Sequence, residues 1–83
     1  MSNEAAVKKT LDSVLNLGGR ADDFDRATPL LGHVPELDSM AVVVLITTLE
    51  EQFGIVVDDD EISAETFETL GSLIDFVDAK VED

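Results

Sequence analysis

Apolar side chains recur three and four positions apart in three stretches of this chain, which is the pattern of a helix that buries one face. The first stretch covers residues 5–17 and is followed by Gly18-Gly19, a pair suited to end a helix. The last stretch begins after Thr69, a capping residue, and runs to about Val81. Their predicted buried stripes are Ala6, Leu11, Val14, Leu15 and Leu17 in the first, and Leu70, Leu73, Ile74, Val77 and Val81 in the last.

The middle stretch contains seven consecutive apolar residues, Met40 to Ile46, and its local preference is ambiguous. Three adjacent valines favour a strand. The apolar pattern continues as far as Phe53, however, before Gly54 supplies a stop, and Asp38 is a suitable N-cap. We therefore predict a helix that begins after Asp38 and whose core face is formed by Val42, Leu45, Ile46, Leu49 and Phe53.

The connection over residues 18–37 is long and holds three glycines and two prolines. A solvated linker would not also carry apolar side chains, so we predict that this loop packs back over the core through Phe24, Leu30, Leu31, Val34 and Leu37. After Gly54, residues 62–67 are predicted to form a brief fourth helix. The sequence thus predicts one domain, residues 1–83, with an all-α fold: a small four-helix bundle of three longer helices and one short one, with a structured first loop.

Composition limits how so small a chain can be stabilised. With 83 residues and no cysteine, it has neither a disulfide framework nor a thiolate metal site, so its stability must come from packing. Its first ten residues lack the apolar core of a signal peptide, and no apolar run approaches the length of a bilayer crossing. We therefore expect a soluble, cytoplasmic monomer that does not insert into membranes.

The charge of the chain is strongly one-sided. Nineteen Asp and Glu residues face five Lys and Arg residues, which gives a formal net charge of −14, and residues 27–79 contain no Lys or Arg. A field of this sign repels nucleic acid and anionic lipid, and it steers encounters toward positively charged protein surfaces. The alternative is that the acidic residues form only a solubilising shell.

Ser39 is the candidate functional residue, because it opens the middle helix directly behind the structured loop. Free backbone N–H groups and the positive end of the helix dipole favour an anion such as phosphate at this position. The competing explanation is that Asp38 and Ser39 are ordinary capping residues. A catalytic triad with His33 is disfavoured, because the sequence has no G-x-S-x-G elbow and so small a bundle leaves little room for a substrate pocket.

The acidic run Asp58-Asp59-Asp60-Glu61 raises the question of a calcium site. It lacks the alternating ligands, the central glycine and the terminal glutamate of a helix–loop–helix calcium loop. We therefore interpret it as a solvated acidic turn and expect no specific metal site.

A set of residues on either side of Ser39 forms a known pattern. It comprises Asp38-Ser39-Met40 and the acidic turn after Gly54, together with Val43, Leu45, Leu49, Glu50, Glu51, Phe53 and Ile55. In these residues, and in its helix order, long first loop and acidic balance, the chain resembles the acyl carrier proteins over nearly its whole length. The resemblance implies that Ser39, with Asp38 completing the motif, receives 4′-phosphopantetheine from coenzyme A. It also implies a carrier of acyl thioesters that is not an enzyme, and it accounts for the missing cysteine, since the working thiol would belong to the attached group.

Several positions depart from the commonest pattern of that family. Glu36 stands two residues before Asp38, where a glycine is frequent, and Met40 and Ala41 replace a leucine and an acidic residue. Val44 stands where carriers for fatty acid synthesis commonly have glutamate. The phrase VPELDSMAVV is more similar to carriers associated with exosortase and exopolysaccharide gene clusters in Gram-negative bacteria. This similarity implies a specialised pathway rather than general fatty acid synthesis.

The resemblance also implies partner enzymes, namely a phosphopantetheinyl transferase and an acyl ligase or acyltransferase. Residues beside Ser39 that fall outside the core stripe are candidates for a docking surface that meets basic and apolar groups. These candidates are Met40, Val43, Val44, Thr47, Glu50 and Glu51. Two alternatives stay open: Val43 and Val44 only widen the core stripe, or the chain is an acidic protein-interaction module without a prosthetic group.

Overall fold

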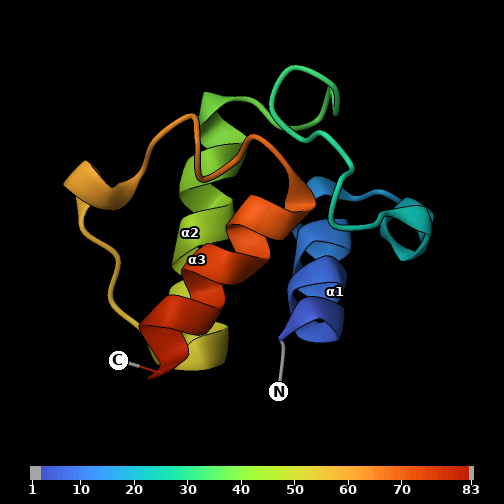
Figure 1. Cartoon of the computed structure of the whole chain (residues 1–83). Coiled ribbons are helices and arrows are strands. Elements are labelled where there is room, and N and C mark those ends of the chain that lie inside the picture. The colour runs from blue at the N-terminus through green and yellow to red at the C-terminus, as the bar shows by residue number, and fades with distance from the viewer. Residues whose placement is uncertain (1–2, 83) are drawn as a thin grey trace.

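The computed structural model describes residues 3–82, which form three α-helices joined by loops that contain short 3₁₀ turns. The helices are α1 (Glu4–Leu15), α2 (Ser39–Phe53) and α3 (Leu70–Glu82), and the turns are η1 (Arg20–Asp23) and η2 (Asp59–Glu61). Figure 1 shows α3 crossing in front of α2, with α1 beside them and the first loop running above α1 to the end where α2 begins. Residues 3–82 contain no strand beyond an isolated bridge between Pro29 and Thr69, so the helical fold class is confirmed.

The core is built from all three helices, from the first loop and from Phe67 in the loop between α2 and α3. In the loop, Leu30, Val34 and Leu37 are buried, which confirms that it packs back over the helices, although Leu31 is exposed and Phe24 only half-buried. The large side chains that are fully buried are Val7, Leu11, Leu30, Leu45, Leu49, Leu70, Leu73, Ile74 and Val77.

α1 ends earlier than its apolar pattern predicts. The last helical residue is Leu15, and Asn16, not a glycine, adopts the left-handed conformation at φ 57° that closes the helix. Asparagine tolerates this region better than most residues. The carboxylate of Asp12 then accepts the backbone N–H groups of Gly19 and Ala21, which turns the chain back toward α1.

The buried stripe of α1 also differs from the prediction. Val7 and Thr10 are buried together with Leu11 and Leu15, whereas Ala6 is exposed and Val14 half-buried. Thr10 is tolerated there because its hydroxyl donates to the carbonyl of Ala6 at 2.9 Å. The assignment of Ala6 to the core was therefore wrong.

The predicted short helix over residues 62–67 does not form. The turn η2 lies earlier, and residues 63–67 make overlapping four-residue turns, with the N–H of Thr66 donating to the carbonyl of Ser63 and that of Phe67 to the carbonyl of Ala64. The hydroxyl of Thr66 donates to the carbonyl of Glu61, a local bond that competes with helix formation. The bundle thus has three α-helices and 3₁₀ turns where four helices were predicted.

α3 begins as its sequence predicts. The N–H of Ser72 donates to the hydroxyl of Thr69, and the N–H of Thr69 donates to the hydroxyl of Ser72, both at 3.1 Å, which makes a reciprocal cap. The predicted stripe Leu70, Leu73, Ile74 and Val77 is buried. Val81 is exposed, because it lies in the final turn beyond the packed part of the helix, so its assignment to the core was wrong.

Candidate functional site

Ser39 is the first residue of α2 and is exposed. The residue before it, Asp38, is the N-cap: its backbone is extended, and its Oδ1 atom accepts the N–H of Ala41 at 2.8 Å. The carbonyl of Asp38 accepts the N–H of Val42 at 2.9 Å, the first bond of the helical ladder. Because Asp38 performs the capping, the Ser39 hydroxyl is available for other chemistry.

The chain that leads into α2 is fixed by tertiary contacts. Val34 and Leu37 are buried in the core on either side of Pro35 and Glu36. The guanidinium of Arg20 pairs with the carboxylate of Glu36, which ties this segment to η1. The position of Ser39 therefore depends on contacts with residues far away in the sequence.

A shallow apolar groove of about 360 Å³ lies beside Ser39. It falls at the lower end of the roughly 300–1,000 Å³ that ligand pockets usually span, so it suits a slender chain better than a compact ligand. One side comes from the start of α2 and the other from residues 62–67, a segment that no pattern in the sequence links to Ser39. The groove is lined by Leu31, Leu37, Asp38, Ser39, Val42, Ile62, Ser63, Ala64 and Phe67.

The exposed face of α2 forms a second feature beside Ser39. Met40, Val43, Val44, Thr47 and Glu51 follow a helical spacing of three and four residues, and all five are exposed. The exposed fractions of Met40, Val43 and Val44 are 73%, 60% and 50%, so neither valine widens the core stripe. The Thr47 hydroxyl donates to the carbonyl of Val43 at 3.0 Å, which leaves little polar character in the middle of this face.

Glu50 lies to one side of that face. It is half-buried, and its Oε2 atom accepts the N–H of Val57 at 2.9 Å. This bond holds the chain that leaves α2, so Glu50 has a structural role that its sequence position did not reveal.

The second long loop, residues 54–69, joins α2 to α3, and Glu61 in its middle forms an ion pair with Lys80 in the last turn of α3. Glu61 Oε1 accepts from Lys80 Nζ at 2.5 Å and from the backbone N–H of Asp58 at 3.1 Å. The hydrogen bond from Lys80, and after it that from Asp58, holds the pKa of Glu61 below its ordinary value of 4.5. The acidic run predicts a solvated turn around Glu61, and no local pattern in the sequence indicates this pair. In the part of the chain that the structure describes, no cluster of His, Cys, Asp and Glu is placed to hold a metal ion.

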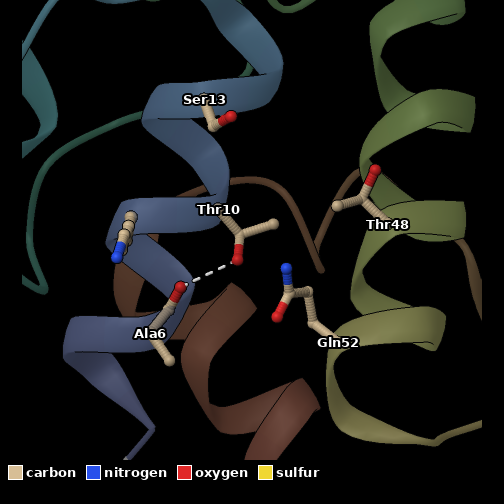
Figure 2. A pocket seen from close by; sticks show the side chains of 6 residues that line it. Ala6, Thr10, Ser13, Thr48 and Gln52 are labelled. Atoms are coloured by element: carbon tan, nitrogen blue, oxygen red, sulfur yellow. Dashed lines mark hydrogen bonds between the residues drawn. The ribbon is translucent and has the colours of Figure 1, made fainter.

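A second hollow, of about 220 Å³, lies between α1 and α2, and most of the residues that line it are of polar types (Figure 2). Thr10 and Thr48 face each other across it, but each hydroxyl donates back to its own helix, to the carbonyls of Ala6 and Val44. Thr48 lies nine residues after Ser39, about 13 Å along the helix axis at 1.5 Å per residue. This hollow is therefore separate from the Ser39 groove. No helix among residues 3–82 is long and apolar enough to span a membrane.

Comparison with known proteins gives consistent results. Residues 5–77 match the family described as "Phosphopantetheine attachment site". An acyl carrier protein of Desulforapulum autotrophicum is 37% identical over 82 residues, which cover 96% of this chain and 99% of that protein. The solution structure of a holo acyl carrier protein from Nitrosomonas europaea is 57% identical, with a TM-score of 0.92 and complete coverage of both chains.

Proposed function

The chain belongs to the acyl carrier protein family, whose members hold a covalent phosphopantetheine group, and we propose that Ser39 is the residue that carries this group. The observation that carries the proposal is the position of Ser39: an exposed hydroxyl at the start of α2, outside the capping bond and beside an apolar groove. Proteins of this family are carriers and not enzymes. Ser39 is thus a site of attachment, and other proteins perform the chemistry.

The residues around Ser39 fit the attached group. The first backbone N–H groups of α2 have no partner within the helix, so they favour the negative charge of a phosphate. The groove offers an apolar lining from Leu37, Val42 and Ile62 for a slender chain. When bound, the group supplies a terminal thiol that holds acyl groups as thioesters.

Partner enzymes dock, in this proposal, on the exposed face of α2. The surface consists of Met40, Val43, Val44, Thr47 and Glu51, with Glu50 at its edge. It combines an apolar centre with the acidic surroundings of a chain whose net charge is −14. A phosphopantetheinyl transferase and an acyl ligase or acyltransferase that read it would present apolar side chains flanked by basic ones.

We assign the protein to a specialised pathway rather than to general fatty acid synthesis. Two observations support this: the similarity of VPELDSMAVV to carriers from exosortase and exopolysaccharide gene clusters, and the exposed Val44. It would act as a monomer in the cytoplasm, where coenzyme A is available. The second candidate, an acidic interaction module without a prosthetic group, rests on charge alone.

Intact-mass measurement tests the attachment. The wild-type chain, treated with coenzyme A and a broad-specificity phosphopantetheinyl transferase, should gain the mass of one group, and Ser39→Ala should gain none. Ser63→Ala is the matched control, because Ser63 lines the same groove and should not affect the gain. A wild-type chain that stays unmodified would favour the interaction module, and modification of Ser39→Ala would move the site elsewhere.

A further inference from the structure

The two sides of the groove beside Ser39 are held in different ways. The α2 side rests on buried Leu37 and on the Asp38 cap. The other side, the groove wall, consists of residues 62–67. Its residues Ser63, Ala64 and Glu65 are exposed, so burial holds this stretch of the wall weakly. Phe67 at one end of the wall is buried in the core, and Ile62 at the other end is half-buried against it, so the position of the exposed middle depends on how these two ends are tethered.

One tether acts at the C-terminal end of the wall, where the N–H of Leu31 donates to the carbonyl of Phe67 at 3.0 Å. At its N-terminal end stands Glu61, directly before Ile62. The carboxylate of Glu61 accepts from the N–H of Asp58 and from Lys80 Nζ, which connects the start of the wall to the last turn of α3.

This ion pair is better shielded from water than the other two described in residues 3–82. The side chains of Lys80 and Glu61 are 19% and 32% exposed, whereas those of Arg26 and Asp75 are 48% and 66% exposed, and those of the Arg20 pair are 54% and 36% exposed. Charges with less water around them are screened less, so they attract each other more strongly, and removing one partner leaves the other poorly solvated.

The charge pattern of the sequence gives a second reason to expect that Lys80 stabilises the start of the wall. It is the only Lys or Arg that follows Arg26. Its partner Glu61 closes an acidic run that includes Asp58 and Asp60, and Lys80 offsets the repulsion within that run. Removing this one cation leaves the start of the wall both untethered and self-repelling.

We propose that the Lys80–Glu61 pair is a positioning device that holds the groove wall toward α2 and so sets how far the groove opens beside Ser39. With the pair intact, the groove stays narrow. With the pair broken, residues 62–64 move away from α2 and the groove admits a bulkier apolar chain. The inference rests on the proposed function, since the width of the groove matters only if the group carried at Ser39 enters it.

Hydrogen exchange of backbone amides in the unmodified full chain tests this device. Lys80→Met should speed exchange over residues 61–66 by about three- to fivefold, the range expected for one partly shielded ion pair, and leave α1 unchanged. Arg26→Met is the matched control: it also removes one positive charge and one ion pair, but at a site away from the wall. Lys80→Arg retains the charge and should keep the wild-type exchange pattern.

Binding of Nile red, an uncharged apolar dye, gives a second readout of the groove. Its fluorescence should rise with Lys80→Met and stay at the wild-type level with Arg26→Met and Lys80→Arg. Equal exchange and equal dye binding in the two Met variants would overturn the proposal, as would faster exchange spread evenly over α1 and the wall. The mass gain at Ser39 is measured on the same protein variants. If Ser39 is modified normally but exchange in Lys80→Met is unchanged, the positioning role of the ion pair is rejected and the proposed function stands. If Ser39 is not modified, the proposed function is rejected, and the exchange rates still test the role of the ion pair.

Discussion

The Oδ1 atom of Asp38 accepts the backbone N–H of Ala41 at 2.8 Å. This bond separates the capping of α2 from the attachment of a group, two tasks that Asp38 and Ser39 could otherwise share. Serine and aspartate are both good N-caps, so the sequence alone leaves open which of the two residues stabilises the start of α2. The structure gives that task to Asp38. The Ser39 hydroxyl can then be modified without cost to the cap.

The first prediction follows from this division. Asp38→Ala should lower the free energy of unfolding by about 1 kcal/mol, the usual loss for a removed N-cap. Ser39→Ala should lower it by less than about 0.5 kcal/mol, because most substitutions at exposed positions have effects of this size. Urea unfolding followed by far-ultraviolet circular dichroism measures both, since the chain has no Trp or Tyr for fluorescence. Equal losses in the two variants would show that Ser39 shares the capping task.

The second prediction concerns the exposed face of α2. Because the Val44 side chain is half exposed, Val44→Glu should leave helicity intact, and a broad-specificity phosphopantetheinyl transferase, which does not depend on the cognate contacts, should still modify Ser39. It should slow loading by the cognate acyl ligase about tenfold, the effect of losing one moderate contact in an interface. Recognition by a fatty-acid-synthesis enzyme should improve.

The control for this surface is Val56→Glu. Val56 is 74% exposed and lies outside α2, so the variant adds the same charge away from the proposed docking face. Loading rates measured with purified ligase should fall only for Val44→Glu. An undiminished rate would show that this face does not choose the partner, and a collapse of thermal stability would show that Val44 is needed for packing.

The third prediction is a dependence on pH. The folded-state pKa of Glu61 lies below 4.5, so its ionised form stabilises the protein above that pH, and this contribution is lost as the pH falls through the lowered value. Glu61→Gln should therefore be less stable than wild type by a constant margin from neutral pH down to about 4.5, and the margin should shrink below it. Urea unfolding across this range measures the margin, with Glu65→Gln as a control for the loss of one exposed negative charge.

The fourth prediction concerns Gly71 in the first turn of α3. A Cβ atom at this position would lie 2.7 Å from the carbonyl oxygen of Arg26 and 3.1 Å from its Cβ. Alanine usually stabilises a helix by about 1 kcal/mol relative to glycine. Here Gly71→Ala should instead lower stability by roughly 1–3 kcal/mol, because the first loop must shift. A raised melting temperature would show that the loop yields without strain.

The sequence by itself determined the features that arise from local physics. Apolar spacing predicted the three helices, and Asp38 and Thr69 predicted two helix starts, because capping involves residues only a few positions apart. The same local pattern identified Ser39 as the functional candidate and made the family resemblance visible. The apolar residues of the first loop also predicted that it would pack on the core, since a solvated loop has no use for them.

Only the tertiary structure decided the conformation of the second long loop and the existence of the groove beside Ser39. Residues 62–67 carry a plausible helical pattern, but the carbonyls of Phe67 and Glu68 accept the N–H groups of Leu31 and Leu30, which fixes this segment as turns. The Lys80–Glu61 pair joins residues 19 positions apart, and no periodicity within a single helix encodes such a contact. Contacts between distant residues depend on how the helices cross, and this crossing is settled by the whole core together and not by any one segment.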